Sequence, residues 1–293
     1  MTSDKEIRYR GRFAPSPTGL LHLGSLSSAL GSFLDTKSNQ GEWLLRIEDI
    51  DPPREAPDAK DIIPQQLADH GLDWDGSISY QSENSDRYIE ALQALEAKKA
   101  TYPCSCSRQD IKRMGGLYDR TCLRHTPKAD TEVATRLLID DAVGWTDLIR
   151  GKLEFSCTEL GGDFVLRRKE GLFSYQLAVA VDDHQQGITR VVRGADLLDS
   201  TARQLHIFKH LGLAAPEYAH LPVMLAANGQ KLSKQNFAPA LDSSRATENI
   251  YQALRVLGQN PPEKLKRASL STILQWGIHH WSLRNVPAQD KTI

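Results

Sequence analysis

The chain has no long apolar run and almost no net charge. No segment approaches the roughly 18 consecutive apolar residues that a membrane-spanning helix needs, and residues 1–6 lack the apolar core of a signal peptide. We therefore expect a cytoplasmic protein with no membrane partner. A formal charge of −1 argues against a generally basic nucleic-acid binder, because the whole molecule would attract phosphate only weakly. Any RNA contact is then expected from local patches.

Cysteine is also scarce, with four residues in the chain, yet three of them lie close together at Cys104, Cys106 and Cys122. Disulfides are not expected in a cytosolic protein, so these residues are either metal ligands or free thiols. Cys-x-Cys is a less specific metal signal than Cys-x-x-Cys, which leaves both readings open. The same region carries a basic cluster that is either an RNA-binding patch or an ordinary solvated surface: Arg108, Lys112, Arg113, Arg120, Arg124 and Lys128.

Size and composition are those of an ordinary soluble globular protein. The 293 residues are 40% hydrophobic and 25% charged, which suits one large or two smaller domains. From residue 7 to about 95, β-type runs alternate with helical periodicity, which predicts βαβ units and a parallel sheet. A helix is expected from Gly24 toward Asn39. Trp43–Ile47 is expected as a buried strand that delivers Glu48 and Asp49 to its carboxyl end, where open α/β sheets bind ligands.

The pattern changes near residue 101, which predicts an insertion between two halves of a nucleotide-binding domain. The insertion contains strand-like runs at 133–139 and 153–157, and the sheet is expected to resume at Phe164–Arg168. Later elements are a helix near 175–181, a strand at 188–193, and helices near 200–211, 250–257 and 270–281. The predicted division of the chain is 1–100, 101–160, 161–240 and 241–293.

Two short segments more than two hundred residues apart have features suited to binding a nucleoside triphosphate. Residues 12–25 join a strand to a helix whose first turn carries small residues, so free backbone N–H groups and the positive helix end would face an anion, with His22 at that mouth. Residues 231–235 place Lys231 and Lys234 where they could meet departing phosphates. Taken singly, His22 could be a helix cap or core residue, and the lysines a solvated face.

Together, in this order and spacing, the segments resemble the two signatures of class I aminoacyl-tRNA synthetases, the His-x-Gly-His type and the Lys-Met-Ser-Lys-Ser type. The resemblance runs from about residue 9 to 240 and is closest to the glutamate-specific branch. It implies an α/β fold with a Rossmann-type parallel-sheet catalytic domain in two halves, a zinc-bearing insertion like an acceptor-binding region, and a short helical C-terminal region. Its further markers are residues 11–19, 44–51, 181–184, 187–189 and 192–196.

Several details resemble one subgroup, the truncated glutamyl-queuosine tRNA(Asp) synthetases, which glutamylate a modified anticodon base. They are residues 51–55, 104–106 and 115–119 and the early end of the chain, which leaves no room for an anticodon-binding domain. This resemblance implies a ligase that activates L-glutamate with ATP, independently of tRNA, and transfers it to queuosine of tRNA(Asp). The alternatives are glutamylation of a tRNA 3′ end or another nucleophile, and a non-catalytic sensor.

The chemistry requires positioning and charge stabilisation while a carboxylate attacks the α-phosphorus of ATP. Glu48 is the natural partner for the substrate ammonium, and guanidiniums at Arg12 and Arg193 would favour glutamate over glutamine. The resemblance implies catalytic roles for His22, Lys231 and Lys234. It implies ATP, with Mg²⁺, at His22, Gly24, Ser25, Lys231, Ser233 and Lys234, and glutamate at Arg12, Phe13, Ala14, Pro15, Ser16, Glu48, Tyr175 and Arg193.

The chain departs from the ordinary glutamate branch at two places. Where that branch reads Arg-Gly-Glu-Asp-His, residues 193–197 read Arg-Gly-Ala-Asp-Leu, and the second signature ends in Gln235. These changes are compatible with adenylate formation but argue against docking a normal tRNA acceptor end. The resemblance also implies one structural zinc ion, held by Cys104, Cys106 and Cys122 with Tyr118 as the fourth ligand. His125 is chemically the more ordinary fourth ligand, so that position stays open.

Overall fold

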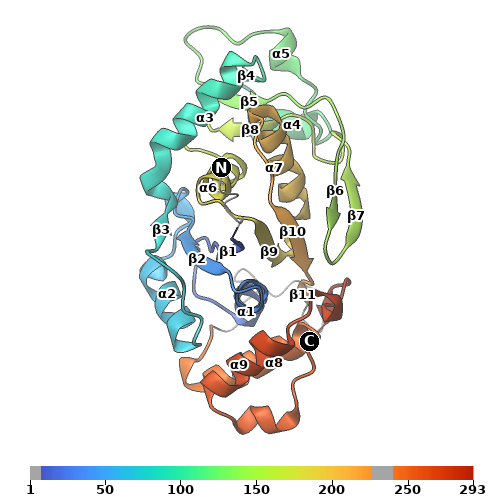
Figure 1. The fold of residues 1–293 in the computed structure, drawn as a ribbon. Coiled ribbons are helices and arrows are strands. Elements are labelled where there is room, and N and C mark those ends of the chain that lie inside the picture. The colour runs from blue at the N-terminus through green and yellow to red at the C-terminus, as the bar shows by residue number, and fades with distance from the viewer. Residues whose placement is uncertain (1–7, 226–239, 293) are drawn as a thin grey trace, which may run out of the picture.

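The computed structural model describes residues 8–225 and 240–292, and its centre is a parallel sheet (Figure 1). Strand β2 (Glu42–Ile47) pairs in parallel with β1 (Arg10–Phe13) and β3 (Ser79–Tyr80), and β9 (Arg190–Gly194) pairs in parallel with β10 (Glu217–Leu221). The backbone N–H of Thr189 donates to the carbonyl of Arg10 at 2.9 Å, which places β9 beside β1. The predicted α/β fold with a parallel sheet is confirmed.

Helix α1 (Leu23–Ser38) connects β1 to β2, as the sequence predicted for residues 24–39. Its Leu26, Ala29, Leu30 and Leu34 are fully buried against the sheet and the C-terminal helices. The approach of α1 to β1 is close enough to require glycine at position 11, where an added Cβ would lie 2.1 Å from Oγ1 of Thr36. Strand β2 also matches its prediction, and its buried alternation of Trp43, Leu45 and Ile47 anchors the loop that follows.

Four further helices surround the sheet, and α3, α6 and α7 pack on one another beside it (Figure 1). Helices α6 and α7 lie at the positions predicted for residues 175–181 and 200–211, with longer bounds in the structure. The bounds are α2 (Ala59–Asp69), α3 (Ser85–Ala97), α6 (Tyr175–Gln185) and α7 (Leu198–Leu211).

The insertion forms a sheet of its own, in the antiparallel order β4-β5-β8. The prediction that Phe164–Arg168 resumes the parallel sheet was wrong, because β8 pairs antiparallel with β5. A short alternating strand fits either sheet, and its local pattern does not specify its partner. The elements are β4 (Thr101–Cys104), α4 (Arg108–Arg113), α5 (Thr121–Arg124), β5 (Ala134–Leu137), the hairpin β6 (Val143–Asp147) and β7 (Gly151–Phe155), and β8 (Phe164–Arg167).

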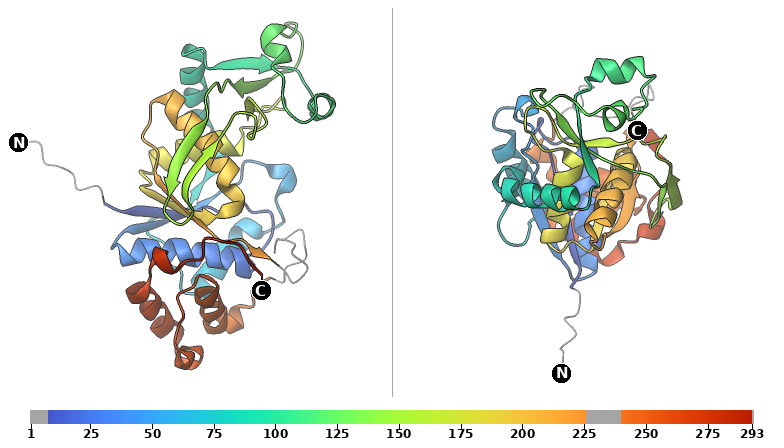
Figure 2. Two further views of the ribbon diagram at one scale, coloured as in Figure 1. Left: turned by 90° about the vertical axis from the view of Figure 1, so that its right-hand side faces the viewer. Right: turned by 90° about the horizontal axis from the view of Figure 1, so that it is seen from above.

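The insertion and the C-terminal helices lie at opposite ends of the molecule, with the parallel sheet between them (Figure 2). Helices α8 (Ala246–Val256) and α9 (Leu270–His280) lie where helices were predicted near residues 250–257 and 270–281. Both pack against α1. Strands β11 (Met224–Leu225) and β12 (Lys291–Thr292) form a short parallel pair. Among the described helices, none has the length and apolar character to cross a bilayer. The four-part division of the chain stays a prediction.

Candidate active site

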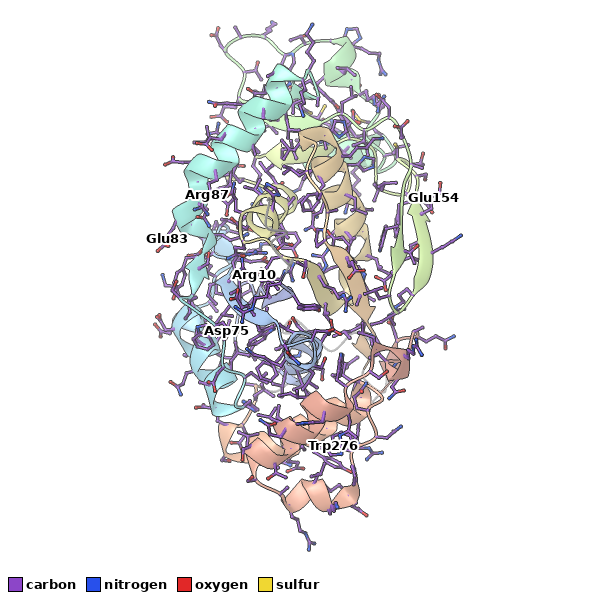
Figure 3. All side chains as sticks on the ribbon, viewed as in Figure 1. Arg10, Asp75, Glu83, Arg87, Glu154 and Trp276 are labelled. Carbon is purple, nitrogen blue, oxygen red and sulfur yellow. The ribbon has the colours of Figure 1, made fainter. Side chains whose placement is uncertain are left out.

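Charged side chains from three parallel strands and one helix meet at the carboxyl edge of the sheet. Arg12 lies one residue before the end of β1, Glu48 follows β2, and Arg193 lies in β9, and each exposes 5% or less of its surface. At the start of β1, Arg10 (Figure 3) donates to Glu42 and to the carbonyl of Gln186, which ties β1 to β2 and to the end of α6. Buried charges must be paired or solvated by a ligand, so the partners of these residues decide what the site can bind.

Arg12 is held by a carboxylate that the sequence did not single out. Its Nε and Nη2 donate to the two oxygens of Asp183 at 3.2 and 3.3 Å. Arg46, fully buried in β2, donates from Nη2 to Oδ1 of the same residue at 2.7 Å. Burial opposes ionisation of Asp183, but Arg12 and Arg46 outweigh it and hold its pKa below the usual range. Asp183 therefore fixes the orientation of Arg12.

Oε1 of Glu48 is a buried carboxylate oxygen that finds no hydrogen-bond partner within residues 8–225 and 240–292. The nearest cation is Arg46, whose Nη2 lies 3.6 Å from that oxygen. Burial raises the pKa of Glu48 to about 7, although Arg46 and Arg12 act in the opposite direction. A buried acceptor that lacks a donor loses free energy until a donor arrives, and a ligand ammonium meets this need.

Arg193 is aimed by polar side chains from α6 and α7. Its Nη2 donates to Oγ1 of Thr201 at 2.6 Å and to Oε1 of Gln204 at 2.7 Å, and its Nη1 lies 3.4 Å from the Tyr175 hydroxyl. Its guanidinium lies over the ring of Tyr218, 5.6 Å from the centroid. Nε of Arg193 and the hydroxyl of Tyr218 are buried and have no partner among the described residues.

These atoms define the chemistry of the buried cluster: within the part of the chain that the structure describes, Glu48 lacks a donor, while Arg193 and Tyr218 lack acceptors. Burial and the nearby Glu48 raise the pKa of Tyr175 to about 12, so its hydroxyl stays protonated and can also donate. A ligand with an ammonium group and a carboxylate would complete both sets. An amino acid with an acidic side chain has these groups.

The loop after β1 lies beside Glu48, but one of its predicted ligand-binding side chains points elsewhere. The backbone N–H of Glu48 donates to the carbonyl of Pro15 at 3.0 Å, so residues 14–16 lie next to the start of the β2 loop. Phe13 alternates with Arg12 along β1 and stacks on Trp43, with 6.4 Å between ring centroids. Its side chain belongs to the core below the sheet, so the structure does not bring it to the charged pocket.

His22 caps α1 with its own imidazole. Its Nδ1 accepts from the backbone N–H groups of Gly24 and Ser25 at 3.1 and 3.3 Å, and Oγ of Ser25 accepts from the N–H of His22 at 2.8 Å. The expectation that these helix N–H groups are free to face an anion was therefore wrong, because a side chain satisfies them first. An accepting Nδ1 leaves the ring proton on Nε2. Lys231, Ser233, Lys234 and Gln235 lie outside the described residues.

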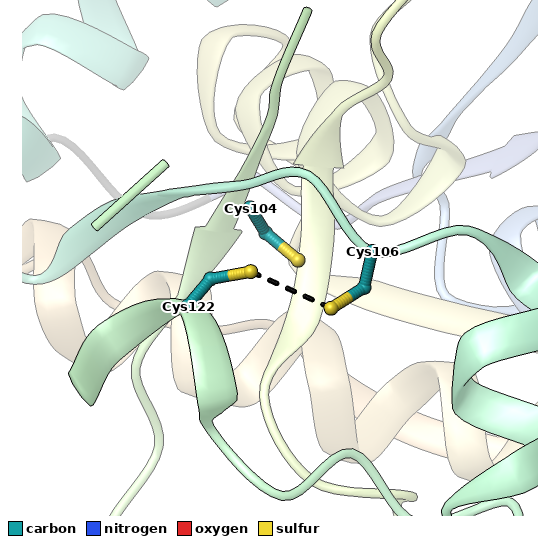
Figure 4. A group of neighbouring side chains, drawn as sticks. All are labelled: Cys104, Cys106 and Cys122. Carbon is teal, nitrogen blue, oxygen red and sulfur yellow. Dashed lines mark hydrogen bonds between the residues drawn. The ribbon is translucent and has the colours of Figure 1, made fainter. Parts of the chain in front are cut away.

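Three cysteines, from β4, the loop after it and α5, meet in the insertion (Figure 4). The sulfur atoms of Cys104, Cys106 and Cys122 all lie within 4.8 Å of one another, and 3.4 Å separates those of Cys106 and Cys122. In a tetrahedral zinc site, Zn–S bonds of about 2.3 Å place sulfurs about 3.8 Å apart, so the cluster fits this metal. The hydroxyl of buried Tyr118 lies at the cluster and accepts from the N–H of Cys122 at 3.2 Å, whereas His125 is exposed.

Buried residues of the insertion support the cysteine cluster. Asp163 accepts from the hydroxyl of Tyr102 at 2.7 Å and from two nitrogens of Arg120. The guanidinium of Arg136 covers the Tyr118 ring at 4.0 Å. The candidate basic patch is thus partly structural. Arg120 pairs inward, and Arg113 and Arg124 pair with neighbouring carboxylates.

Comparison with known proteins decides the family. Residues 8–264 match the family of class I tRNA synthetases (E and Q), catalytic domain. The chain belongs to this family. Its relatives include the glutamyl-Q tRNA(Asp) synthetases of Pectobacterium atrosepticum, 47% identical over 96% of this chain and 88% of the relative, and of Chromobacterium violaceum, 47% identical over 96% of each. The recognised resemblance is confirmed, and the chain is a ligase of the class I synthetase family.

Solved structures of this family share the fold. A glutamate-tRNA synthetase from Elizabethkingia anophelis superposes with a TM-score of 0.82 at 25% identity, covering 98% of this chain and 68% of the other. A glutamate tRNA ligase from Elizabethkingia meningosepticum, in complex with its amino acid, gives 0.81 at 27% identity, covering 97% and 67%. The catalytic domain of these synthetases therefore has the same architecture as the sheet and insertion described above.

Sequence reasoning missed several residues of the site. Arg46 and Asp183 lay within the recognised markers but received no role, although a charged residue inside a buried strand or an apolar helix signals a buried partner. Thr201, Gln204 and Tyr218 carried no such signal, because the packing of α7 and β10 brings them to Arg193.

Proposed function

We propose that the chain uses ATP to convert L-glutamate to glutamyl-adenylate without help from tRNA, and then transfers glutamate to queuosine in the anticodon of tRNA(Asp). The observation that carries the first step is a cluster of buried side chains in which, among the described residues, Glu48 lacks a donor while Arg193 and Tyr218 lack acceptors. The names of the curated relatives support the second step.

The pocket supports recognition of glutamate by charge. The ammonium of the substrate would donate to Oε1 of Glu48, and the side-chain carboxylate would accept from Arg193 and Tyr218. Arg12, already paired with Asp183, adds positive charge nearby. Glutamine would bring an amide N–H₂ where the pocket offers donors, and the unmade hydrogen bonds would penalise it.

Activation is a displacement at phosphorus. An α-carboxylate oxygen of glutamate attacks the α-phosphorus of ATP, the bond from that phosphorus to the bridging β-oxygen breaks, and pyrophosphate leaves with Mg²⁺. We assign His22 to the phosphates, with Nε2–H as the donor because Nδ1 is used in the helix cap. Lys231 and Lys234 remain the predicted partners of the leaving group, and Ser233 a further ATP contact. Gly24 and Ser25 would lie beside the nucleotide without donating their N–H groups to it, because His22 accepts from both.

We assign the cysteine cluster to one structural zinc ion. Cys104, Cys106, Cys122 and Tyr118 would hold it, and the ion would stabilise the insertion without taking part in the reaction. Residues 101–160 would then present RNA to the pocket between the halves at 1–100 and 161–240, with 241–293 as a helical support. ATP and tRNA as substrates also favour a cytoplasmic location.

The transfer step fits the chemistry of queuosine. This base carries a cyclopentene cis-diol, whose hydroxyls imitate the ribose diol that synthetases normally acylate. One hydroxyl attacks the carbonyl carbon of the adenylate, an ester forms, and AMP leaves. The loss of a carboxylate and an imidazole at Ala195 and Leu197 supports an acceptor other than the usual 3′ end.

The test of activation is ATP–pyrophosphate exchange in the absence of tRNA. We expect exchange with glutamate and little with glutamine. An absolute requirement for tRNA, or equal exchange with both amino acids, would contradict the proposal. No exchange at all, with or without tRNA, would point to the sensor alternative.

A further inference from the structure

A continuous chain of buried hydrogen bonds runs from the β6–β7 hairpin of the insertion to Arg193. The Nδ1 of His220 lies 2.6 Å from Oδ2 of Asp147, and its Nε2 lies 2.8 Å from Oγ1 of Thr201. The same hydroxyl accepts from Nη2 of Arg193 at 2.6 Å. The hydrogen bonds thereby join one residue each from β6, β10, α7 and β9. Of the four residues, only Arg193 belongs to the proposed glutamate site.

The hydrogens in this chain can be assigned in one direction. Oδ1 of Asp147 accepts from three backbone N–H groups, those of Ile149, Arg150 and His220. This residue is therefore an ionised acceptor, and its neighbour Nδ1 of His220 is the donor. Nε2 of His220 then accepts a hydrogen bond from the Thr201 hydroxyl. The oxygen of that hydroxyl accepts a hydrogen bond from Nη2 of Arg193. Every member donates to the next residue toward Asp147.

The imidazole at the centre is held in place by aromatic rings. His220 is fully buried, stacks on Tyr218 with 6.0 Å between centroids at an interplanar angle of 12°, and lies 6.2 Å from the ring of Trp145 in β6. The ring of Tyr218 also lies beneath the guanidinium of Arg193. The hairpin and β10 thus fix the ring plane and the tautomer of His220 together.

We propose that Asp147, His220 and Thr201 are positioning residues that aim the guanidinium of Arg193 at the side-chain carboxylate of glutamate. The inference rests on the proposed role of Arg193 and extends the glutamate site to the insertion hairpin. Thr201 and Gln204 together occupy Nη2 of Arg193, which leaves the buried Nε without an acceptor among the described residues and available to a substrate carboxylate. Removing the Thr201 hydroxyl takes away one hydrogen-bond acceptor from the Arg193 guanidinium. It also takes away the hydrogen-bond donor of Nε2 of His220.

The test compares Thr201→Val with Thr36→Val in glutamate-dependent ATP–pyrophosphate exchange. Both threonines are fully buried in helices, and both hydroxyls lie within hydrogen-bond reach of the carbonyl four residues earlier, at 3.2 and 2.8 Å. Thr36 takes no part in the series of hydrogen bonds that leads from Asp147 to Arg193, so it serves as the matched control. We expect Thr201→Val to raise the KM for glutamate about tenfold, with the KM for ATP unchanged and kcat altered less than about threefold.

Conservative variants separate positioning from packing. Thr201→Ser keeps the hydroxyl and should restore most of the glutamate affinity. Asp147→Asn offers an amide N–H to Nδ1 of His220, so the ring proton should move to Nε2, which ¹⁵N chemical shifts of the imidazole report without any assay of activity. The same variant should raise the KM for glutamate, and it decides the matter if Thr201→Val is too unstable to assay.

The outcomes distinguish failure of the positioning inference from failure of the proposed function. If the wild type exchanges but Thr201→Val matches Thr36→Val, or Thr201→Ser is as impaired as Thr201→Val, the positioning chain is refuted and the glutamate site stands. An unchanged His220 tautomer in Asp147→Asn also refutes it. If the wild type shows no glutamate-dependent exchange, the proposed function fails, and the inference fails with it.

Discussion

His22 caps helix α1 and is also the residue proposed to contact ATP, two roles that the sequence analysis treated as alternatives. The ring of a histidine has two nitrogens with separate hydrogen-bond duties. Because Nδ1 accepts from the first turn of α1, Nε2 must carry the proton, and it is the atom that can donate to a phosphate. The cap thereby fixes the tautomer that the proposed chemistry needs.

Two substitutions at His22 should separate these roles. Asparagine can still accept from the N–H groups of Gly24 and Ser25, whereas alanine cannot. We expect His22→Asn to reduce pyrophosphate exchange about 10²-fold with little loss of stability. His22→Ala should lose a similar activity and also about 1 kcal/mol in the free energy of unfolding, measured with urea. Full exchange by His22→Asn would show that the imidazole acts only as a cap.

If Glu48 binds the ammonium of glutamate as proposed, glutamate binding should depend on pH. Its pKa in the free protein is raised from 4.5 to about 7 by burial, so the carboxyl is partly protonated at neutral pH. An ammonium bound at Oε1 favours the ionised form, and binding therefore requires loss of that proton. The affinity for glutamate should rise about tenfold between about pH 6 and pH 8 and then level off.

Calorimetry can measure this dependence and count the proton that glutamate binding releases. In Glu48→Gln, glutamate should bind more weakly and with a flat profile over the same range. A wild-type affinity that falls as the pH rises would contradict the assignment of Glu48 to the ammonium.

At the scale of helices and strands, sequence patterns predicted the elements whose formation depends on residues close together in the chain. The period of α1 and the buried run of β2 depend on neighbours a few residues away, and both appeared where expected. The partner of β8 is strand β5, more than twenty residues earlier in the chain. Asp183 pairs with Arg12, more than a hundred residues away. Arg12, Glu48 and Arg193 were found because recognised motifs contained them, whereas Thr201 depends on packing that no local pattern encodes.

The cysteine cluster should determine the stability of the insertion. Purified protein should contain about one zinc ion per chain, and Cys104→Ser should lose most of it and lower the Tm by about 5 °C or more. Metal analysis and thermal melts test this directly. Metal-free wild-type protein with the same Tm would defeat the assignment.

Tyr118 and His125 form a matched pair for the fourth ligand. The Tyr118 hydroxyl lies at the cysteines and is buried, whereas His125 is exposed. Tyr118→Phe removes one oxygen and keeps the ring under Arg136, so it should weaken zinc retention in a chelator titration. His125→Ala should retain zinc like the wild type. The reverse result would reassign the ligand.

At the scale of the whole molecule, the insertion is joined to the parallel sheet beside the proposed glutamate site. The N–H of Leu148 in the β6–β7 hairpin donates to the carbonyl of Tyr218 in β10 at 2.9 Å, next to the ring that supports Arg193. Three exposed basic residues of the insertion make no ion pair with the described carboxylates: Arg108, Lys112 and Lys128. RNA held by the insertion would therefore lie on a part of the protein that contacts the amino-acid site.

The acceptor is tested by changing the RNA at one place at a time. We expect glutamate to be transferred to tRNA(Asp) that contains queuosine, and we expect transfer to continue when the 3′-terminal adenosine has been removed, because the base diol is the nucleophile. A transcript with guanosine in place of queuosine lacks that diol and should accept nothing, although adenylate still forms. Radiolabelled glutamate followed by nuclease mapping locates the ester. Efficient charging of the transcript, or of tRNA(Glu) at its 3′ end, would assign the activated glutamate to a ribose and leave the activation pocket as described.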